Sequence, residues 1–214
     1  MRTIELDDLP ELEVLRATRT EDWYPKVGRI FATRDQLLVK LVDLEPADVP
    51  YYVERLLVAG SSPFSDPIEA LVEERGRFRG WVERYLPDLE PFRYFEAESE
   101  VFAAHCERQQ YLASRGYFDL DAATINYARR ADGRVFTFDK DAVFRLDSLA
   151  PCEDAFRAQG EWPFWNLDGG SYFVLLRQSY RSIPLDVQRA ISAAFASGDP
   201  GTIAATFASA RAQV

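Results

Sequence analysis

Histidine and cysteine are scarce in this chain of 214 residues, which contains one histidine and two cysteines. The cysteines, Cys106 and Cys152, do not form a CxxC motif, and the histidine is His105. A zinc site built from these residue types is therefore not expected. A serine–histidine–aspartate hydrolase is not expected either, because no nucleophile motif accompanies His105. Two reduced thiols are typical of a cytoplasmic protein, and this is the location that we expect.

The sequence also lacks an apolar run of the roughly 18–20 residues that a bilayer-spanning helix needs. Its first 15 residues are acidic and alternate in polarity, unlike the apolar core of a signal peptide. The net charge of −10 provides no excess of basic residues for nucleic acid or an anionic membrane. We therefore expect neither as a partner. Hydrophobic residues make up 47% of the chain, which is sufficient for a globular core.

Alternating apolar residues predict five antiparallel strands in the first part of the chain, with one helix over residues 45–61. The strands are expected at residues 12–18, 27–33, 36–43, 67–74 and 78–86. Gly76 supplies the turn of the last hairpin. Prolines at positions 87 and 91 mark a boundary between a first lobe, residues 1–88, and a second lobe, residues 89–214.

The second part of the chain is expected to be mostly helical. A helix over residues 96–115 has only a moderate apolar stripe, and residues 150–182 are aromatic without a clear period. A hairpin is expected between them, and Gly198 separates two helices at the end of the chain. The predicted elements are, in order, a helix at 96–115, strands at 124–129 and 134–138, and helices at 184–198 and 199–214. The fold class is therefore α+β.

Three side chains with oxygen atoms, those of Asp121, Asn126 and Asp139, lie around this hairpin. Asn126 follows Asp121 by five residues, and Asp139 follows Asn126 by thirteen. Together with the order of strands and helices, this spacing resembles the protein-kinase-like superfamily, both its serine/threonine protein kinases and its aminoglycoside-phosphotransferase-type kinases. The resemblance covers roughly residues 12–146. It implies a two-lobed fold with a five-stranded first lobe and a shortened helical second lobe.

The resemblance also implies a role for individual residues. Asp121 would be the catalytic base, and Asn126 and Asp139, at opposite ends of the hairpin, would bind Mg²⁺. Lys40, flanked by apolar residues on the third strand, would contact the α- and β-phosphates of ATP, and Glu54 on the next helix would pair with Lys40. Four consecutive residues would offer backbone groups to adenine: Glu83, Arg84, Tyr85 and Leu86.

Four departures make this a minimal and divergent member of the superfamily, of a kind that looks bacterial. No glycine occurs between Leu15 and Val27, where kinases carry a glycine-rich phosphate loop. Asp139-Lys140-Asp141 replaces the usual Asp-Phe-Gly, and Asp119 occupies the place of a histidine. The chain after Asp141 is also too short for a complete second lobe.

The expected activity is transfer of the γ-phosphoryl group of ATP to a hydroxyl group, on a serine or threonine of a protein rather than on a small molecule. Two alternatives remain open. One is a pseudokinase that acts as a nucleotide-binding module or a scaffold, and the other is transfer of AMP from the same site. Some small bacterial kinases are delivered into host cells as effectors, but no feature of this sequence indicates delivery.

Overall fold

The computed structural model describes residues 1–10, 12–17, 27–33, 35–84, 86, 90–120, 123–140, 142–148 and 169–214. The protein is of mixed α+β type and divides into two units. Unit 1 contains Met1–Ser61 and Asp66–Asp88, and unit 2 contains Ser62–Ser65 and Leu89–Val214. The contacts of Ser62–Ser65 thus place this short segment with unit 2, although sequence analysis assigned it to the first part of the chain.

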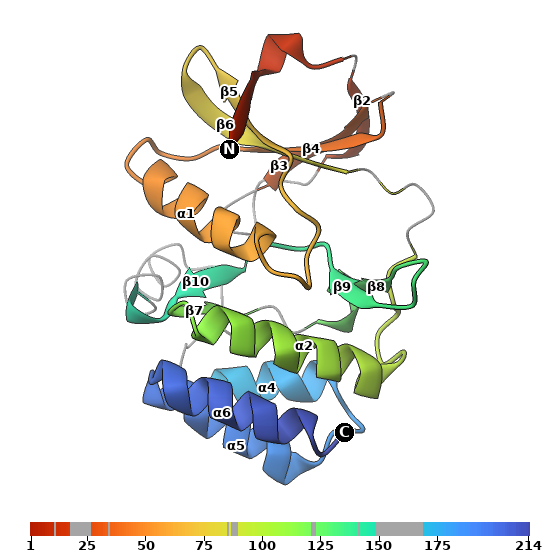
Figure 1. Ribbon diagram of the computed structural model, residues 1–214, viewed down its shortest axis with the longest axis vertical. Helices are drawn as coiled ribbons and strands as arrows, with labels where there is room; N and C mark the ends of the chain where they lie inside the picture. The colour runs from red at the N-terminus through yellow and green to blue at the C-terminus, as the bar shows by residue number, and fades with distance from the viewer. Residues whose placement is uncertain are drawn as a thin grey trace. The chain divides into compact units, whose positions relative to one another are not determined.

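Unit 1 is a six-stranded sheet with one α-helix in its described residues, as Figure 1 shows. Its elements are β1 (Arg2–Glu5), β2 (Leu12–Ala17), β3 (Val27–Thr33), β4 (Leu37–Val42), α1 (Val49–Gly60), β5 (Ala70–Glu74) and β6 (Arg77–Arg84), with a 3₁₀ turn at Leu6–Asp8. The strand order is β1-β5-β6-β4-β3-β2, and only the β1–β5 pair is parallel. All five expected strands are present. Sequence analysis missed β1, because four residues give too little alternation to detect.

The two faces of this sheet carry separate apolar clusters. On one face, Val39 of β4 packs with Val72 and Val82. On the other face, α1 covers the sheet, and its Tyr52 and Leu56 pack in a cluster with residues of β4 and β6. Alternation along β4 thus sends successive side chains to different clusters, as expected for a strand that is buried on both sides.

The β5–β6 hairpin turns at two residues in the left-handed region. Arg75 has a φ of 54° and Gly76 has a φ of 73°. Two successive positive φ values are typical of a type I′ turn, whose twist matches that of the flanking strands. The prediction that Gly76 supplies this turn is confirmed.

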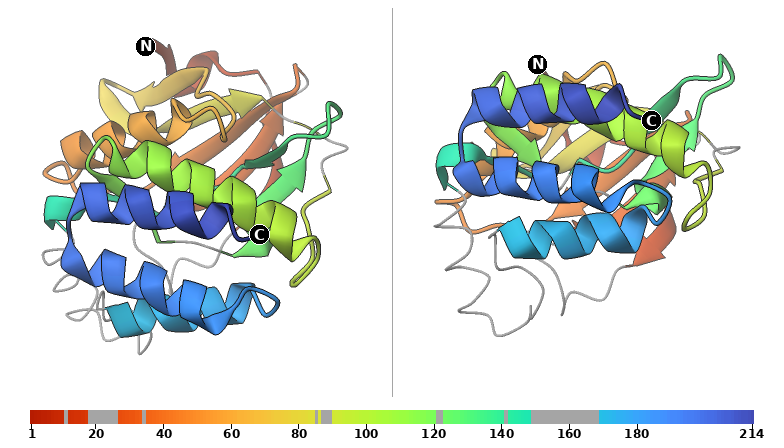
Figure 2. Two further views of the ribbon diagram at one scale, coloured as in Figure 1. Left: turned by 60° about the horizontal axis from the view of Figure 1, so that its bottom comes forward. Right: turned by 90° about the horizontal axis from the view of Figure 1, so that it is seen from below.

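Unit 2 combines helices with two small antiparallel sheets, β7–β10 and β8–β9. Its described elements are α2 (Glu98–Ala113), β7 (Tyr117–Asp119), β8 (Tyr127–Arg129), β9 (Val135–Thr137), β10 (Val143–Arg145), α4 (Gly169–Ser179), α5 (Leu185–Ser197) and α6 (Pro200–Arg211), with 3₁₀ turns at Thr124–Asn126 and Leu146–Ser148. Helix α6 packs against α2 and α5, and α4 packs against α5 (Figure 2). None of the helices in the described part of the chain has the length and apolar character needed to cross a bilayer.

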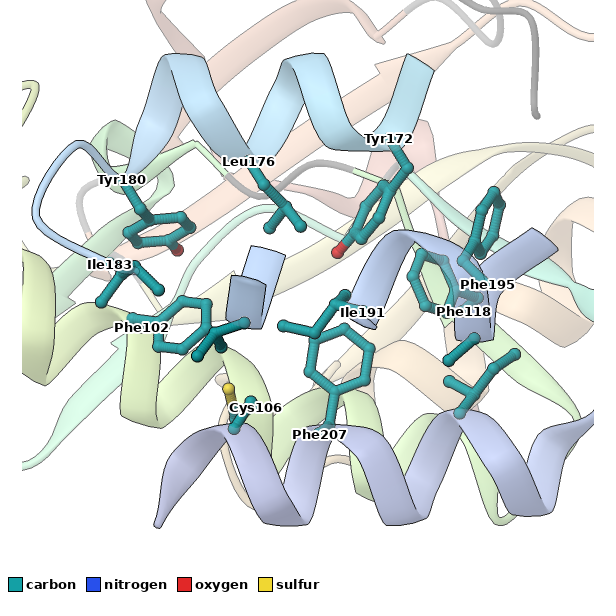
Figure 3. Close-up of a cluster of buried hydrophobic side chains, with 14 of the residues drawn as sticks. Phe102, Cys106, Phe118, Tyr172, Leu176, Tyr180, Ile183, Ile191, Phe195 and Phe207 are labelled. Carbon is teal, nitrogen blue, oxygen red and sulfur yellow. The ribbon is translucent and has the colours of Figure 1, made fainter. Parts of the chain in front are cut away.

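The core of unit 2 is rich in aromatic side chains. Phe118 of β7 lies 4.5 Å from Phe195 and 5.0 Å from Tyr172, measured between ring centroids. Figure 3 shows these rings together with the buried side chains of the surrounding helices. The buried Cys106 thiol belongs to the same cluster, and burial raises its pKa above the usual range. Aromatic packing therefore joins all four helices of the described part of unit 2.

The side of α2 that faces β7 is polar, yet it is buried. His105, Arg108 and Gln109 are spaced so that they share this side of the helix, and all three are fully buried. Arg108 Nε donates a hydrogen bond to Asp119 Oδ2 at 2.7 Å, and another guanidinium nitrogen donates to the Ser65 hydroxyl. The Gln109 side-chain amide pairs with the backbone N–H and C=O of Asp119 at 3.0 and 2.6 Å. These polar contacts explain why the apolar stripe of α2 is weak.

Loss of the Asp119 charge should destabilise the protein strongly. In Asp119→Asn, the fully buried Arg108 would lose its counter-ion, which should cost about 3–5 kcal/mol in the free energy of unfolding. Urea unfolding would measure this change. The control is Asp147→Asn, which removes a charge from the exposed Arg145–Asp147 pair and should cost less than about 1 kcal/mol. Equal effects of the two substitutions would contradict the prediction.

Candidate functional site

The first candidate residue, Lys40, lies on β4 with its side chain only 8% exposed. Its Nζ atom is 3.5 Å from Oε1 of Glu83, whose side chain is 3% exposed, and 5.5 Å from the centre of the Trp81 ring. The Trp81 indole N–H donates a hydrogen bond to the same Glu83 oxygen. A buried lysine is thus held against a buried carboxylate, in an environment where neither charge would be stable alone.

Glu83 is the partner that the structure gives Lys40, whereas sequence analysis proposed Glu54 for this role. Glu54 is exposed on the second turn of α1, and its pairing with Lys40 remains a prediction. Sequence analysis expected Glu83 to serve adenine through its backbone. Residue 83 lies in the β4–β6 ladder opposite Leu38, so its side chain lies on the same face of the sheet as Lys40.

The other residues proposed for adenine differ in position. Arg84 is the last residue of β6, is exposed and pairs with Leu37 in the ladder. Leu86 follows the strand and is half-buried, while Tyr85 lies outside the described residues. Their contacts with adenine remain predictions.

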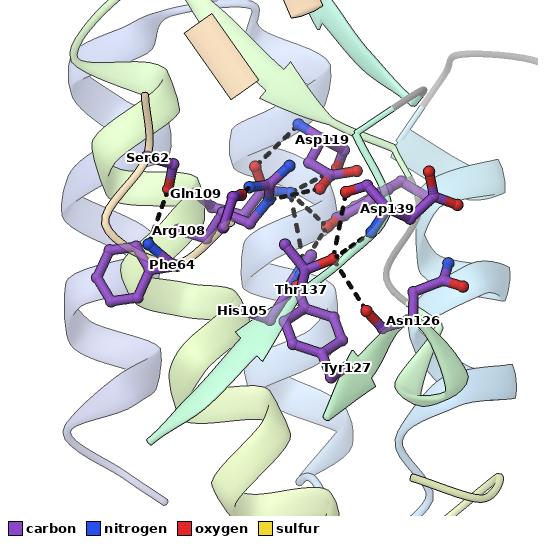
Figure 4. A network of polar contacts seen from close by, with 12 residues as sticks. Ser62, Phe64, His105, Arg108, Gln109, Asp119, Asn126, Tyr127, Thr137 and Asp139 are labelled. Carbon is purple, nitrogen blue, oxygen red and sulfur yellow. Dashed lines mark hydrogen bonds and ion pairs between the residues drawn. The ribbon is translucent and has the colours of Figure 1, made fainter. Parts of the chain in front are cut away.

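The second group of candidate residues lies at the open end of the β8–β9 hairpin. Asn126 ends the 3₁₀ turn before β8, and Asp139 comes two residues after β9. Both are half-buried, and Figure 4 shows their side chains on the same side of the hairpin, directed away from α2. The hairpin thus brings together two side chains that the sequence separates by thirteen residues.

Sequence analysis placed residues 124–126 in a strand, but these residues form a 3₁₀ turn. The turn is closed by a hydrogen bond from the Asn126 N–H to the Ala123 carbonyl at 3.1 Å. A single 3₁₀ turn of three residues is too short to show its own period in the sequence. It therefore could not be distinguished from the strand that follows it. The correction changes the backbone at Asn126 and leaves its place at the mouth of the hairpin unchanged.

Thr137 connects the two candidate ligands, and sequence analysis did not identify it. Its hydroxyl donates to the Asn126 carbonyl at 3.0 Å and accepts from the Asp139 N–H at 3.2 Å. Its own N–H donates to the carbonyl of Phe64 at 2.8 Å, so the hairpin is also attached to the Ser62–Ser65 segment. A threonine that alternates with apolar residues in a strand gives no sequence signal for such a role.

Three expectations concern acids close to this hairpin. Asp121, the proposed base, and Asp141 both lie outside the described residues. Asp119 is described, and it forms the buried ion pair with Arg108. The stretch without glycine, residues 16–26, is described only for the backbone of its first two residues.

The only histidine of the chain lies in a buried hydrogen-bonded cluster. His105 Nδ1 contacts the Tyr127 hydroxyl at 2.9 Å, and Nε2 contacts the Tyr172 hydroxyl at 3.0 Å. Burial, assisted by the positive charge of Arg108, lowers the pKa of His105 to about 3. Burial also raises the pKa of Tyr172. His105 is therefore neutral at physiological pH and stabilises the core, in agreement with its expected place in a helix.

Removal of the Thr137 hydroxyl should loosen the mouth of the hairpin. Thr137→Val keeps the shape of the side chain but leaves the Asp139 N–H without its acceptor, which should cost about 1–3 kcal/mol. Hydrogen exchange of the Asp139 amide, followed by NMR, should become at least about tenfold faster. Thr137→Ser keeps the hydroxyl and should retain most of the protection. Equally slow exchange in the valine and serine variants would show that this hydroxyl does not hold Asp139.

Acidification should weaken the fold through His105. The unfolded chain binds a proton at this residue near pH 6.5, while the folded protein does so only near pH 3, so stability decreases as the pH falls between these values. Between pH 7.5 and 5.5 the loss should be about 1.4 kcal/mol. Urea unfolding at both pH values should show this loss in the wild type, and His105→Gln should lack it. The same pH dependence in both proteins would refute the assignment.

The sequence matches no protein-family model and no curated protein. Its function must therefore be inferred from its own residues. In unit 1 the relevant feature is the buried Lys40–Glu83 ion pair. In unit 2 it is the hairpin that brings Asn126 and Asp139 to one side.

Proposed function

We propose that this protein is an ATP- and Mg²⁺-dependent phosphotransferase of the protein-kinase-like superfamily. It moves the γ-phosphoryl group of ATP to a hydroxyl group, with a serine or threonine of a protein as the acceptor and a small-molecule hydroxyl as the alternative. The observation that carries this proposal is the β8–β9 hairpin, in which Thr137 links Asn126 and Asp139 while their side chains lie on one side.

The side chains at the hairpin mouth fit Mg²⁺ in chemical type. Asn126 and Asp139 provide oxygen atoms, which this hard cation prefers, and both side chains are half-buried. No group of three or more histidine, cysteine, aspartate or glutamate side chains suited to a metal occurs among the described residues. Phosphate oxygens would complete the coordination, as is usual for Mg²⁺. The ion would supply neutralisation of the phosphate charge during transfer.

Two other candidate residues, Asp121 and Lys40, have separate roles in the proposed reaction. The acceptor hydroxyl oxygen forms a bond to the γ-phosphorus, and the bond to the β–γ bridging oxygen breaks, leaving its electron pair on ADP. Asp121, five residues before Asn126, accepts the hydroxyl proton. Lys40 offsets the negative charge of the α- and β-phosphates, and its burial makes this interaction stronger than it would be in water.

A nucleotide-binding scaffold is the second candidate function. The absence of glycine between Leu15 and Val27 favours it, because the glycine-rich loop that holds the phosphates in active kinases is missing. Such a protein would bind ATP without turnover. In AMP transfer the acceptor hydroxyl oxygen instead bonds to the α-phosphorus, and the bond to the α–β bridging oxygen breaks, leaving pyrophosphate. ATP labelled at the α- or the γ-phosphate therefore distinguishes the two transferases.

Asp139→Asn should abolish transfer without unfolding the protein. The wild type should transfer label from γ-labelled ATP with Mg²⁺ to itself or to a generic protein acceptor such as casein, and the variant should do so at least about 100-fold more slowly. Asp132→Asn is the matched control, because it makes the same chemical change at the exposed tip of the same hairpin. It should retain activity.

The outcomes separate the candidates. Label from α-labelled ATP on the acceptor would indicate AMP transfer, and ATP binding without label on any acceptor would indicate the scaffold. Kanamycin in place of casein tests the small-molecule acceptor. An unchanged rate in Asp139→Asn would refute the proposed role of this carboxylate.

A further inference from the structure

The position of Lys40 depends on two neighbouring strands of the same sheet. Lys40 pairs with Trp81 across β4 and β6, and Glu83 is two residues further along β6. Opposite residues and residues two apart share a face, so Lys40, Trp81 and Glu83 all lie on the side of the sheet that α1 covers. The register of β4 against β6 therefore sets the spacing of these three side chains.

Gly80 lies in the β4–β6 ladder opposite Leu41, at a position with no room for a side chain. A Cβ atom at position 80 would overlap the carbonyl oxygen of Lys40. Only glycine therefore permits this approach of β6 to β4. Gly80 therefore belongs to the part of the β4–β6 ladder that carries Lys40 and Trp81.

Glu83 balances the charge of Lys40 inside the protein. Both side chains of the ion pair are more than nine-tenths buried, and an unpaired buried ammonium group is costly and tends to lose its proton. The Trp81 indole N–H, by donating to Glu83 Oε1, limits the rotation of the carboxylate. Glu83 therefore neutralises the Lys40 ammonium group and holds it in place.

We infer that Glu83, rather than Glu54, is the positioning residue that prepares Lys40 for nucleotide phosphates. This inference rests on the proposed function. Because Glu83 and Lys40 belong to adjacent strands, their pairing does not depend on the placement of a helix. Lys40 is thus held in position whether or not α1 moves. Movement of α1 would therefore not switch this ion pair on or off.

The coupling of the two charges can be measured without a nucleotide. The single variants Lys40→Met and Glu83→Gln should each lower the urea midpoint of unfolding, because each leaves one buried group without its partner. The double variant should lower the midpoint by clearly less than the sum of the single effects. Additive effects would overturn the inference that Glu83 balances Lys40.

Binding of ATP with Mg²⁺ and of adenosine, measured by calorimetry, then tests the role toward phosphate. Glu83→Gln should weaken ATP binding about tenfold and leave adenosine binding unchanged, since adenosine has no phosphates. A general distortion of the sheet would weaken both. The control Glu69→Gln changes an exposed glutamate beside β5 and should leave both affinities unchanged.

The competing residue is tested in the same way. A tenfold loss of ATP binding in Glu54→Gln, with normal binding in Glu83→Gln, would overturn the inference and leave the proposed function standing. No binding of ATP to the wild type would instead refute the proposed function, and with it the inference that depends on it.

Discussion

The buried ion pair between Arg108 and Asp119 is the interaction on which unit 2 depends. A guanidinium group in the core is tolerated only with a counter-ion, and here that counter-ion ends β7. The same arginine reaches Ser65, and the neighbouring Gln109 pairs with the backbone of Asp119. One polar side of α2 thus fixes β7, the strand that leads into the segment with Asn126. The ion pair therefore fixes a strand that precedes Asn126 in the chain, while Thr137 holds Asn126 and Asp139 at the hairpin.

Unit 1 also contains a buried cation that needs a counter-ion, but its counter-ion comes from a neighbouring strand. Lys40, a buried cation of unit 1, is neutralised by a carboxylate on the adjacent strand of the sheet, and Gly80 leaves room for the Lys40 carbonyl oxygen. Hydrogen bonds of a β-ladder are difficult to shift without breaking, because a slip of one residue turns every side chain to the other face. A lysine held in this way is rigid. Rigidity would suit the proposed phosphoryl transfer, in which catalysis comes mainly from position and charge.

Periodicity and turn chemistry predicted most of the fold, since long strands, long helices and Gly76 leave local signals in the sequence. The strands β1, β7 and β10 were missed because each has only three or four residues. At the site, the spacing of Asn126 and Asp139 reflects a local hairpin and could be predicted. The partner of Lys40 could not, because the Lys40–Glu83 distance follows from strand register. Buried polar side chains such as Arg108 also weaken the apolar stripe of α2, although the helix itself was predicted.

The segment Ser62–Ser65 has a consequence for how the chain can be divided. The polypeptide passes between the units three times, after Ser61, after Ser65 and after Asp88. A fragment that stops at Asp88 would carry the segment without its hydrogen-bond partners. A fragment that starts at Leu89 would remove the Ser65 hydroxyl that accepts from Arg108 and the Phe64 carbonyl that accepts from the Thr137 N–H. No single cut of the chain therefore separates the two units cleanly.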